Sequence, residues 1–186
     1  MIFGVAVPRA MKDLNEDTFG LLIAFLLPGF ILLWGLSFTS PVVANWLTAY
    51  SAEHAVAVGG FLYSTLASLA LGLLISAVRW LIIDTVLGWL GIHGKGLNYG
   101  KLSDEHVLAA YRAIVANHYR YYQSYANSLI ALGGAFAVYV YQKIALKHEA
   151  VDWYVYAVFI FLLIVLFSAS YDTLKKMYDK MRPILT

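Results

Sequence analysis

Small residues interrupt one apolar run of the sequence at every fourth position. The run covers residues 60–76, and its small residues are Gly60, Ser64, Ser68, Gly72 and Ser76. Serine hydroxyls can line a water-filled path through a membrane, whereas small side chains in such a row let another helix approach closely. A row with this spacing forms an inclined ridge on a helix, which favours close packing. We expect Gly60 and Gly72 to pack and Ser64, Ser68 and Ser76 to be the candidates for a pore wall.

Few ionisable or amide side chains lie in apolar sequence. Asp84 is the only acid between residues 55 and 92, and Arg79 is the nearest positive charge. A carboxylate at that depth must pair, meet water or take a proton, so we predict that Arg79 and Asp84 form an interfacial or gating pair. Asn127 is expected to be an interhelical hydrogen-bond partner, with a pore ligand as the alternative. Gly133 and Gly134 are expected at a helix-packing face.

The sequence lacks the motifs of common hydrolytic sites. It has no HExxH, GxSxG or Walker motif, and it contains no cysteine. The stretch "GIHGKGLNYG" has glycines and a lysine, but not at the spacing of a phosphate-binding loop, so it predicts a hinge. We therefore expect no catalytic activity, no cofactor and no bound metal.

Arg112 and His118 have the Arg-x5-His spacing that resembles the active-site motif of HEPN ribonucleases. The resemblance covers seven residues and implies a composite nuclease site built from two protomers. Six helical steps place the two side chains about 120° apart, off a common face. We favour a packing role for His118 and expect no direct nucleic-acid binding, which leaves a membrane-associated HEPN-like nuclease as the third hypothesis.

The composition is that of a membrane protein. Hydrophobic residues make up 61% of the 186 residues and charged residues only 13%. About 20 apolar residues cross the hydrocarbon core of a bilayer. Four stretches approach this length: 19–38, 55–78, 124–142 and 154–171. The predicted fold is all-α and polytopic, with four transmembrane helices.

The basic residues are divided unequally between the two sides of this arrangement. Eleven of the 13 Lys and Arg residues fall on the side of the termini, and only Lys143 and Lys147 fall on the other. Such an excess marks the cytoplasmic side. The prediction is a multi-pass protein of the inner membrane, with cytoplasmic segments at 1–18, 79–123 and 172–186.

Several helix boundaries follow from local signals. Pro28 predicts a kink in the first span. Apolar sequence continues past Arg79 as far as residue 92, so residues 80–90 are expected to lie along the membrane surface or to extend inward. Ser103 predicts an N-cap, followed by one rod of about 40 residues that includes the third span. The fourth span is expected to continue inward until Pro183.

Aromatic and apolar residues recur at heptad spacing along the rod: Tyr111, His118, Tyr125, Leu132 and Tyr139. This spacing predicts a seam for helix association. On its cytoplasmic part, the residues expected to serve assembly or sensing are Tyr111, Arg112, His118 and Arg120.

Residues 108–181 combine a Tyr- and Arg-rich helix ("YRAIVANHYRYYQSYANSLIAL"), a hairpin of two spans and a charged inward helix ("YDTLKKMYDKM"). This order resembles the SLATT type of two-transmembrane effector from bacterial antiviral defence. The resemblance implies a membrane pore that opens when a cytoplasmic nucleotide-sensing partner is triggered. Two additional spans at the N-terminus depart from the simplest form.

The leading hypothesis is an oligomeric membrane channel or pore-forming effector, gated through its cytoplasmic helices. The expected partners are the lipid bilayer, further copies of the chain, and a cytoplasmic protein or nucleotide-type trigger. The alternative is a non-conducting membrane subunit that anchors or scaffolds a cytoplasmic partner.

Overall fold

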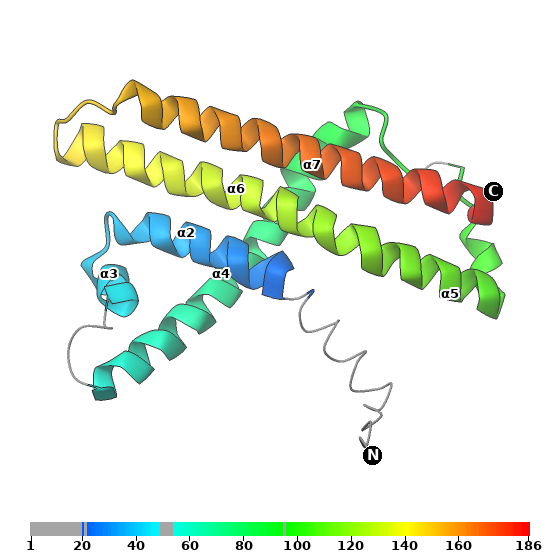
Figure 1. Cartoon of the computed structure of the whole chain (residues 1–186), viewed down its shortest axis with the longest axis horizontal. Helices are drawn as coiled ribbons and strands as arrows, with labels where there is room; N and C mark the ends of the chain where they lie inside the picture. The colour runs from blue at the N-terminus through cyan, green and yellow to red at the C-terminus, as the bar shows by residue number, and fades with distance from the viewer. Residues whose placement is uncertain (1–19, 21, 49–53, 95) are drawn as a thin grey trace, which may run out of the picture.

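The computed structural model describes residue 20 and residues 22–48, 54–94 and 96–186. All secondary structure in these residues is helical, which confirms the all-α part of the predicted fold (Figure 1). The elements are η1 (Leu22–Leu26), α2 (Leu27–Ser37), α3 (Pro41–Thr48), α4 (His54–Trp89), η3 (Tyr99–Ser103), α5 (Glu105–Ile114), η4 (Val115–Tyr119), α6 (Arg120–Tyr141), η5 (Gln142–Leu146) and α7 (Trp153–Leu185). Of the η elements, η3 is a 3₁₀-helix and the others are π-helices. The predicted N-terminal segment 1–18 lies outside the described residues.

Three helical stretches are long and apolar enough, by length and composition, to cross a membrane. They are Val58–Trp89, Glu105–Leu146 and Trp153–Leu185. The second, third and fourth predicted spans fall in these stretches. The first predicted span, 19–38, corresponds to a shorter apolar helix, Leu22–Ser37. The fold therefore indicates a membrane-embedded helical protein.

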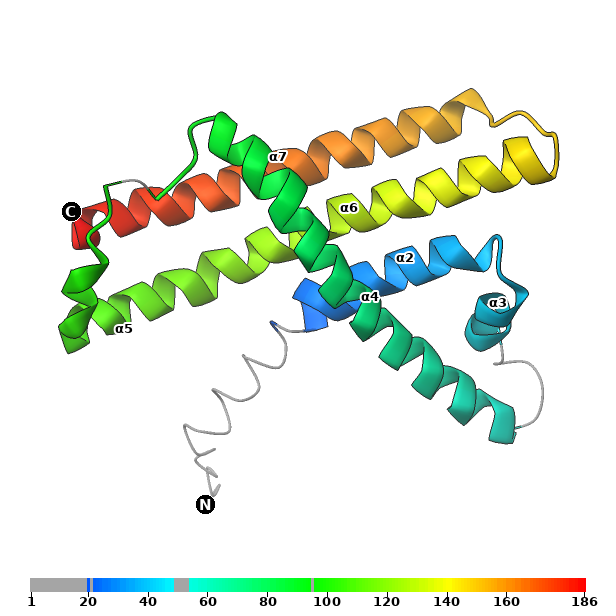
Figure 2. The ribbon, with the colours of Figure 1, turned by 180° about the vertical axis from the view of Figure 1, so that it is seen from behind.

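The sequence left open whether residues 80–90 lie along the membrane surface or extend inward. Helix α4 runs without a break from His54 to Trp89. It has 36 residues, or about 54 Å at 1.5 Å per residue, which exceeds the thickness of the hydrocarbon core. Residues 80–89 continue the same helix beyond Arg79. Figure 2 shows α4 crossing α6 and α7 obliquely.

The predicted rod is present, since α5, η4, α6 and η5 form one helical stretch of 42 residues. Its N-cap is Asp104 rather than Ser103. The Asp104 carboxylate accepts hydrogen bonds from the backbone N–H groups of His106 and Val107, at 2.8 and 3.3 Å. Ser103 ends the preceding 3₁₀-helix, and its hydroxyl donates to Gly100 O at 3.0 Å, so it is already engaged.

Helix α7 lies antiparallel to this rod (Figure 1). The sequence predicts that this helix ends at Pro183, but the helix continues to Leu185. A proline in the last turn removes a single N–H donor, and Thr186 N still donates to Arg182 O at 2.9 Å.

The loop between α6 and α7 is closed by Lys143 and Glu149. The Lys143 ammonium donates to Glu149 Oε2 at 2.5 Å, and Glu149 N donates to Lys143 O at 2.9 Å. The hydrogen bond from Lys143 lowers the pKa of the exposed Glu149 carboxyl. Figure 1 shows this loop and α3 at one end of the molecule, with α5 and the C-terminus at the other.

The main hydrophobic core lies toward the end with the C-terminus. It joins α4, α6 and α7 through Ile83, Leu87, Tyr122, Ala126, Leu129, Leu174, Met177, Met181 and Leu185. The rest of α7 is different, because only 6% of its most apolar stretch is buried within the chain. Phe161, for example, is 64% exposed. Such a surface requires lipid or another protein.

Candidate functional site

The small-residue row lies on the buried face of α4. The buried residues of this helix recur every three or four positions: Gly60, Ser64, Ser68, Gly72, Ile75, Arg79, Ile83 and Leu87. Ser76 lies beside the stripe and is half-buried. The row and the predicted charged residue Arg79 thus share one helix face.

Two glycines bring α4 into backbone contact with η1 and α2. A Cβ on Gly72 would lie 2.0 Å from Phe25 O, and a Cβ on Gly29 would lie 1.7 Å from Ser68 O. No larger residue fits at either position without movement of the backbone. Gly29 was not singled out from the sequence, although it directly follows the proline in the first apolar helix.

The side chains of Ser64 and Ser68 are buried within the chain. Ser64 Oγ donates to Phe61 O of the preceding turn at 3.0 Å. Ser68 is fully buried, and its Oγ has no hydrogen-bond partner among the described residues. A place for Ser64, Ser68 and Ser76 in a pore wall stays a prediction.

Asn127 links α6 to the first apolar helix at Pro28. Proline has no N–H to donate to the carbonyl four residues earlier, which is that of Ala24. Asn127 Nδ2 donates to Ala24 O at 2.7 Å, and the asparagine is fully buried. The helix changes from π to α geometry at Leu27, next to the predicted kink. A neighbouring helix thus satisfies a carbonyl that the proline leaves free.

A charged cluster lies where α4 crosses α6. Arg79 Nη1 is 3.3 Å from Asp84 Oδ1, and the two side chains are 5% and 28% exposed. The Tyr122 hydroxyl donates a hydrogen bond to the same carboxylate oxygen. The guanidinium carbon of Arg79 also lies 5.2 Å from the ring centroid of Tyr122 and 6.0 Å from that of Tyr119.

This cluster joins two long helices through one carboxylate. Arg79 and Asp84 both belong to α4, so the link to the rod is made by the Tyr122 hydroxyl on Asp84 and by the rings of Tyr119 and Tyr122 beside Arg79. Removing one partner of a buried pair leaves an uncompensated charge, which strongly destabilises that arrangement. The cluster can therefore favour one relative position of α4 and α6 over others.

The residues that the sequence predicts to act in cytoplasmic assembly or sensing do not form one site. Tyr111 is half-buried against the core, whereas Arg112 is exposed. His118 Nε2 lies 2.9 Å from Lys180 Nζ on α7. Arg120 packs against Gly20, where a Cβ would lie 2.5 Å from its Cδ. These four side chains are divided among separate contacts with other parts of the chain.

Gly133 and Gly134 have different surroundings. A Cβ on Gly134 would lie 2.9 Å from Leu32 Cδ1 of α2, whereas a Cβ on Gly133 would meet nothing within 4 Å. The close contact of α6 with α2 is at Ala135, whose Cα lies 2.4 Å from a Cβ built on Gly35. Gly35 was another packing residue that sequence analysis missed.

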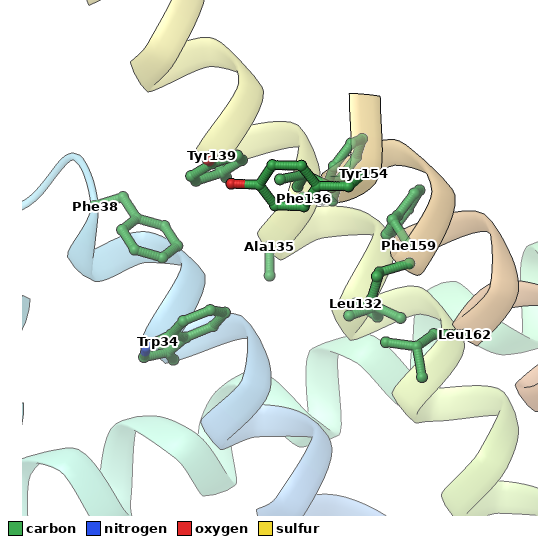
Figure 3. Close-up of a pocket in the computed structure, with 11 residues that line it drawn as sticks. Trp34, Phe38, Leu132, Ala135, Phe136, Tyr139, Tyr154, Phe159 and Leu162 are labelled. Carbon is green, nitrogen blue, oxygen red and sulfur yellow. The ribbon is translucent and has the colours of Figure 1, made fainter. Parts of the chain in front are cut away.

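An apolar groove of about 450 Å³ opens between α2, α6 and α7, near the α6–α7 loop. Figure 3 shows its aromatic walls, with Trp34 and Phe38 facing the α6–α7 pair. Phe136 and Phe159 stack at a centroid distance of 3.8 Å and join α6 to α7 beside the groove. Residues on three separate helices form this groove, so no single sequence pattern predicted it.

The described residues include no group of three or more His, Asp or Glu side chains placed to hold a metal ion. No family model, curated protein or solved structure matches the chain. The class of protein therefore rests on the fold and site alone: an all-helical, membrane-embedded chain with a buried charged cluster between two of its long helices.

Proposed function

We propose that the chain is an oligomeric membrane channel or pore-forming effector, gated through its cytoplasmic helices. The observation that carries the proposal is the link from Tyr122 to the Arg79–Asp84 pair. Tyr122 belongs to the continuous stretch Glu105–Leu146, so displacement of its cytoplasmic end acts on a charged pair of α4. The gate is a change in this link, and the conducting path forms between copies of the chain.

The distribution of charge and loops supports a four-span arrangement with both termini in the cytoplasm. The α6–α7 loop and α3 lie at one end of the molecule, and the C-terminus lies at the other (Figure 1). Lys143 and Lys147 belong to the first end, which would face outward by the positive-inside rule. The helix Leu22–Ser37 is about 24 Å long, so it spans most of the hydrocarbon core.

Assembly is supported by the apolar surface that one chain leaves uncovered. The chain buries only a small share of the most apolar stretch of each long helix. The buried share is 28% for α4, 11% for the rod and 6% for α7. Gly133 offers a further position on α6 where a neighbouring backbone could approach closely. The order of a long helix, a short loop and a second long helix agrees with the SLATT resemblance.

Ion flux through liposomes tests the proposal. We expect liposomes that contain purified Asp84→Asn to leak ions faster than those that contain wild type. The substitution weakens the contact of Asp84 with Tyr122, which joins α4 to α6. Asp172→Asn is the matched control, since Asp172 is exposed and pairs with Lys176 on one helix face. An assembled protein that leaks in neither form contradicts conduction.

That outcome favours the second candidate, a membrane anchor or scaffold for a cytoplasmic partner. The specific observation behind it is the packed cytoplasmic end, where α5 and the last turns of α7 contact one another through Tyr111 and the main core. A nuclease receives no comparable support, since the His118 ring contacts Lys180 and Arg112 is exposed.

A further inference from the structure

A polar pocket of about 230 Å³ lies between the end of α4 and the last turns of α7. Its lining from the α4 end is Leu90, Gly91, Ile92 and His93, and its lining from α7 is Tyr171, Lys175, Tyr178, Asp179 and Arg182. The pocket is separate from the Arg79–Asp84 pair and from the apolar groove of Figure 3.

The α7 wall presents hydrogen-bond donors at helical spacing. Tyr171, Lys175, Tyr178 and Arg182 follow one another at intervals of four, three and four residues, which places them on one helix face. Two cations and two phenols therefore converge on the same cavity. Asp179 is the one carboxylate in the lining, and it lies 3.9 Å from Arg182.

The opposite wall contains a buried ring nitrogen without a partner. His93 lines the pocket, and its Nδ1 has no hydrogen-bond partner among the described residues. Buried polar atoms are almost always hydrogen-bonded, so this nitrogen requires a partner that the described residues do not supply. An imidazole ring carries a hydrogen on at least one nitrogen, so the His93 ring adds a donor to this wall of the pocket.

Lys175 differs from its neighbours on α7 in having no ion pair among the described residues. Lys176 pairs with Asp172 at 2.6 Å, and Lys180 Nζ lies 2.9 Å from His118 Nε2. Lys176 and Lys180 thus have protein partners, whereas Lys175, an exposed side chain that lines the pocket, has none among the described residues. Lys175 is therefore available, with the other donors on the same face of α7, to contact an anion in the pocket.

The pocket also lies at a suitable depth for a lipid headgroup. Tyr171 ends the fourth predicted span, and Lys175 and Arg182 follow within about three helical turns. Trp89 and Leu90, beside the pocket, are 82% and 54% exposed, as expected for side chains in contact with the membrane interface. Basic side chains next to a span attract anionic phospholipids.

We propose that this pocket binds a phosphate group, which is held by Lys175 and Arg182 and whose oxygens accept hydrogen bonds from the pocket tyrosines and His93. The phosphate can belong to an anionic phospholipid or to a soluble phosphate compound, since both present the same oxyanion. The inference goes beyond the proposed channel and is independent of conduction.

Native mass spectrometry of the full chain, released from micelles with phosphatidylglycerol or phosphatidylcholine, tests the site. We expect wild type to retain phosphatidylglycerol in preference to phosphatidylcholine. Lys175→Gln/Arg182→Gln should lose this lipid by about 25-fold, from the usual contribution of two basic side chains near anionic lipid. Lys176→Gln/Lys180→Gln, which removes two charges outside the pocket, should stay within about two-fold of wild type in salt that screens exposed charges.

A second arm replaces lipid with inorganic phosphate and follows the melting temperature. A rise in wild type that Lys175→Gln/Arg182→Gln abolishes, without selective lipid retention, assigns the site to a soluble phosphate compound. A second pocket variant, His93→Ala/Tyr178→Phe, keeps the test valid if the first variant misfolds. It should also weaken binding of the same ligand. Equal lipid retention and equal phosphate response in wild type and both pocket variants overturn the proposal.

Discussion

Asn127 and Pro28 are 99 positions apart in sequence and act on the same carbonyl, that of Ala24. The proline removes the local donor and the asparagine supplies a distant one. The contact between these two residues cannot be predicted from the sequence. Pro28 predicts a kink, but it does not indicate which neighbouring helix donates a hydrogen bond to the free carbonyl. The pattern correctly predicts an interhelical role for Asn127 but not its partner.

A double-mutant cycle tests this relation. Asn127→Ala should lower the free energy of unfolding by about 1–2 kcal/mol, since it leaves Ala24 O unpaired. In the Pro28→Ala background the loss should be smaller, because the substituted alanine has an N–H that can donate to Ala24 O. The measurement is unfolding in mixed micelles, and equal losses in the two backgrounds contradict the shared role.

Gly72 and Gly133 both lie on apolar helices, so the same substitution can be compared at the two positions. Gly72→Ala should lower the free energy of unfolding by about 1–3 kcal/mol, because the new Cβ meets the Phe25 carbonyl. Gly133→Ala meets open space within the chain and should be neutral or stabilising by up to about 1 kcal/mol. A weakened oligomer in Gly133→Ala alone would indicate that this glycine packs between copies. Equal stability of the two variants would contradict the close contact at Gly72.

At the scale of elements, the start of the long rod depends on one cap. Asp104→Ala should destabilise the first turn of α5 by about 1 kcal/mol, since two backbone N–H groups lose their acceptor. Ser103→Ala is the control, because its hydroxyl bonds to the preceding turn. Hydrogen exchange at His106 and Val107 measures the effect. Faster exchange in Ser103→Ala than in Asp104→Ala would contradict the assignment.

Local patterns predicted the elements better than the contacts between them. Apolar length located the three long stretches, and the continuous helical pattern after residue 103 predicted the rod. Ser103 and Asp104 are adjacent residues that both favour N-caps, so the sequence could not separate them. Arg79 and Asp84 were paired because they are neighbours on one helix, whereas Tyr122 lies 38 positions from Asp84 and carries no local signal. The pocket proposed to bind phosphate depends likewise on two distant segments.

At the scale of the whole molecule, the first apolar helix is short, so the number of times that the chain crosses the membrane needs a direct test. Reporter fusions after Thr48 and Lys147 should lie outside the cytoplasm, and fusions after Gly94 and Thr186 should lie inside it, because basic residues gather on the second side. Activity of alkaline phosphatase and of a cytoplasmic reporter distinguishes the two sides. A cytoplasmic position after Thr48 would mean that Leu22–Ser37 does not cross and that three helices span the membrane.

The proposed function joins these scales: one continuous helical rod couples the cytoplasmic end to a charged pair on α4 and so controls a pore between copies. Tyr122→Phe removes the hydroxyl that reaches Asp84 and keeps the buried ring. Tyr121→Phe makes the same change at the adjacent position, whose side chain is 45% exposed.

Single-channel recording of both variants in planar bilayers tests this claim most directly. The account predicts that Tyr122→Phe raises the open probability by about ten-fold without a trigger, as expected for the loss of one hydrogen bond to a charged group. Tyr121→Phe should match wild type. An assembled Tyr122→Phe protein with the same open probability as wild type, or with no conductance, would contradict the account.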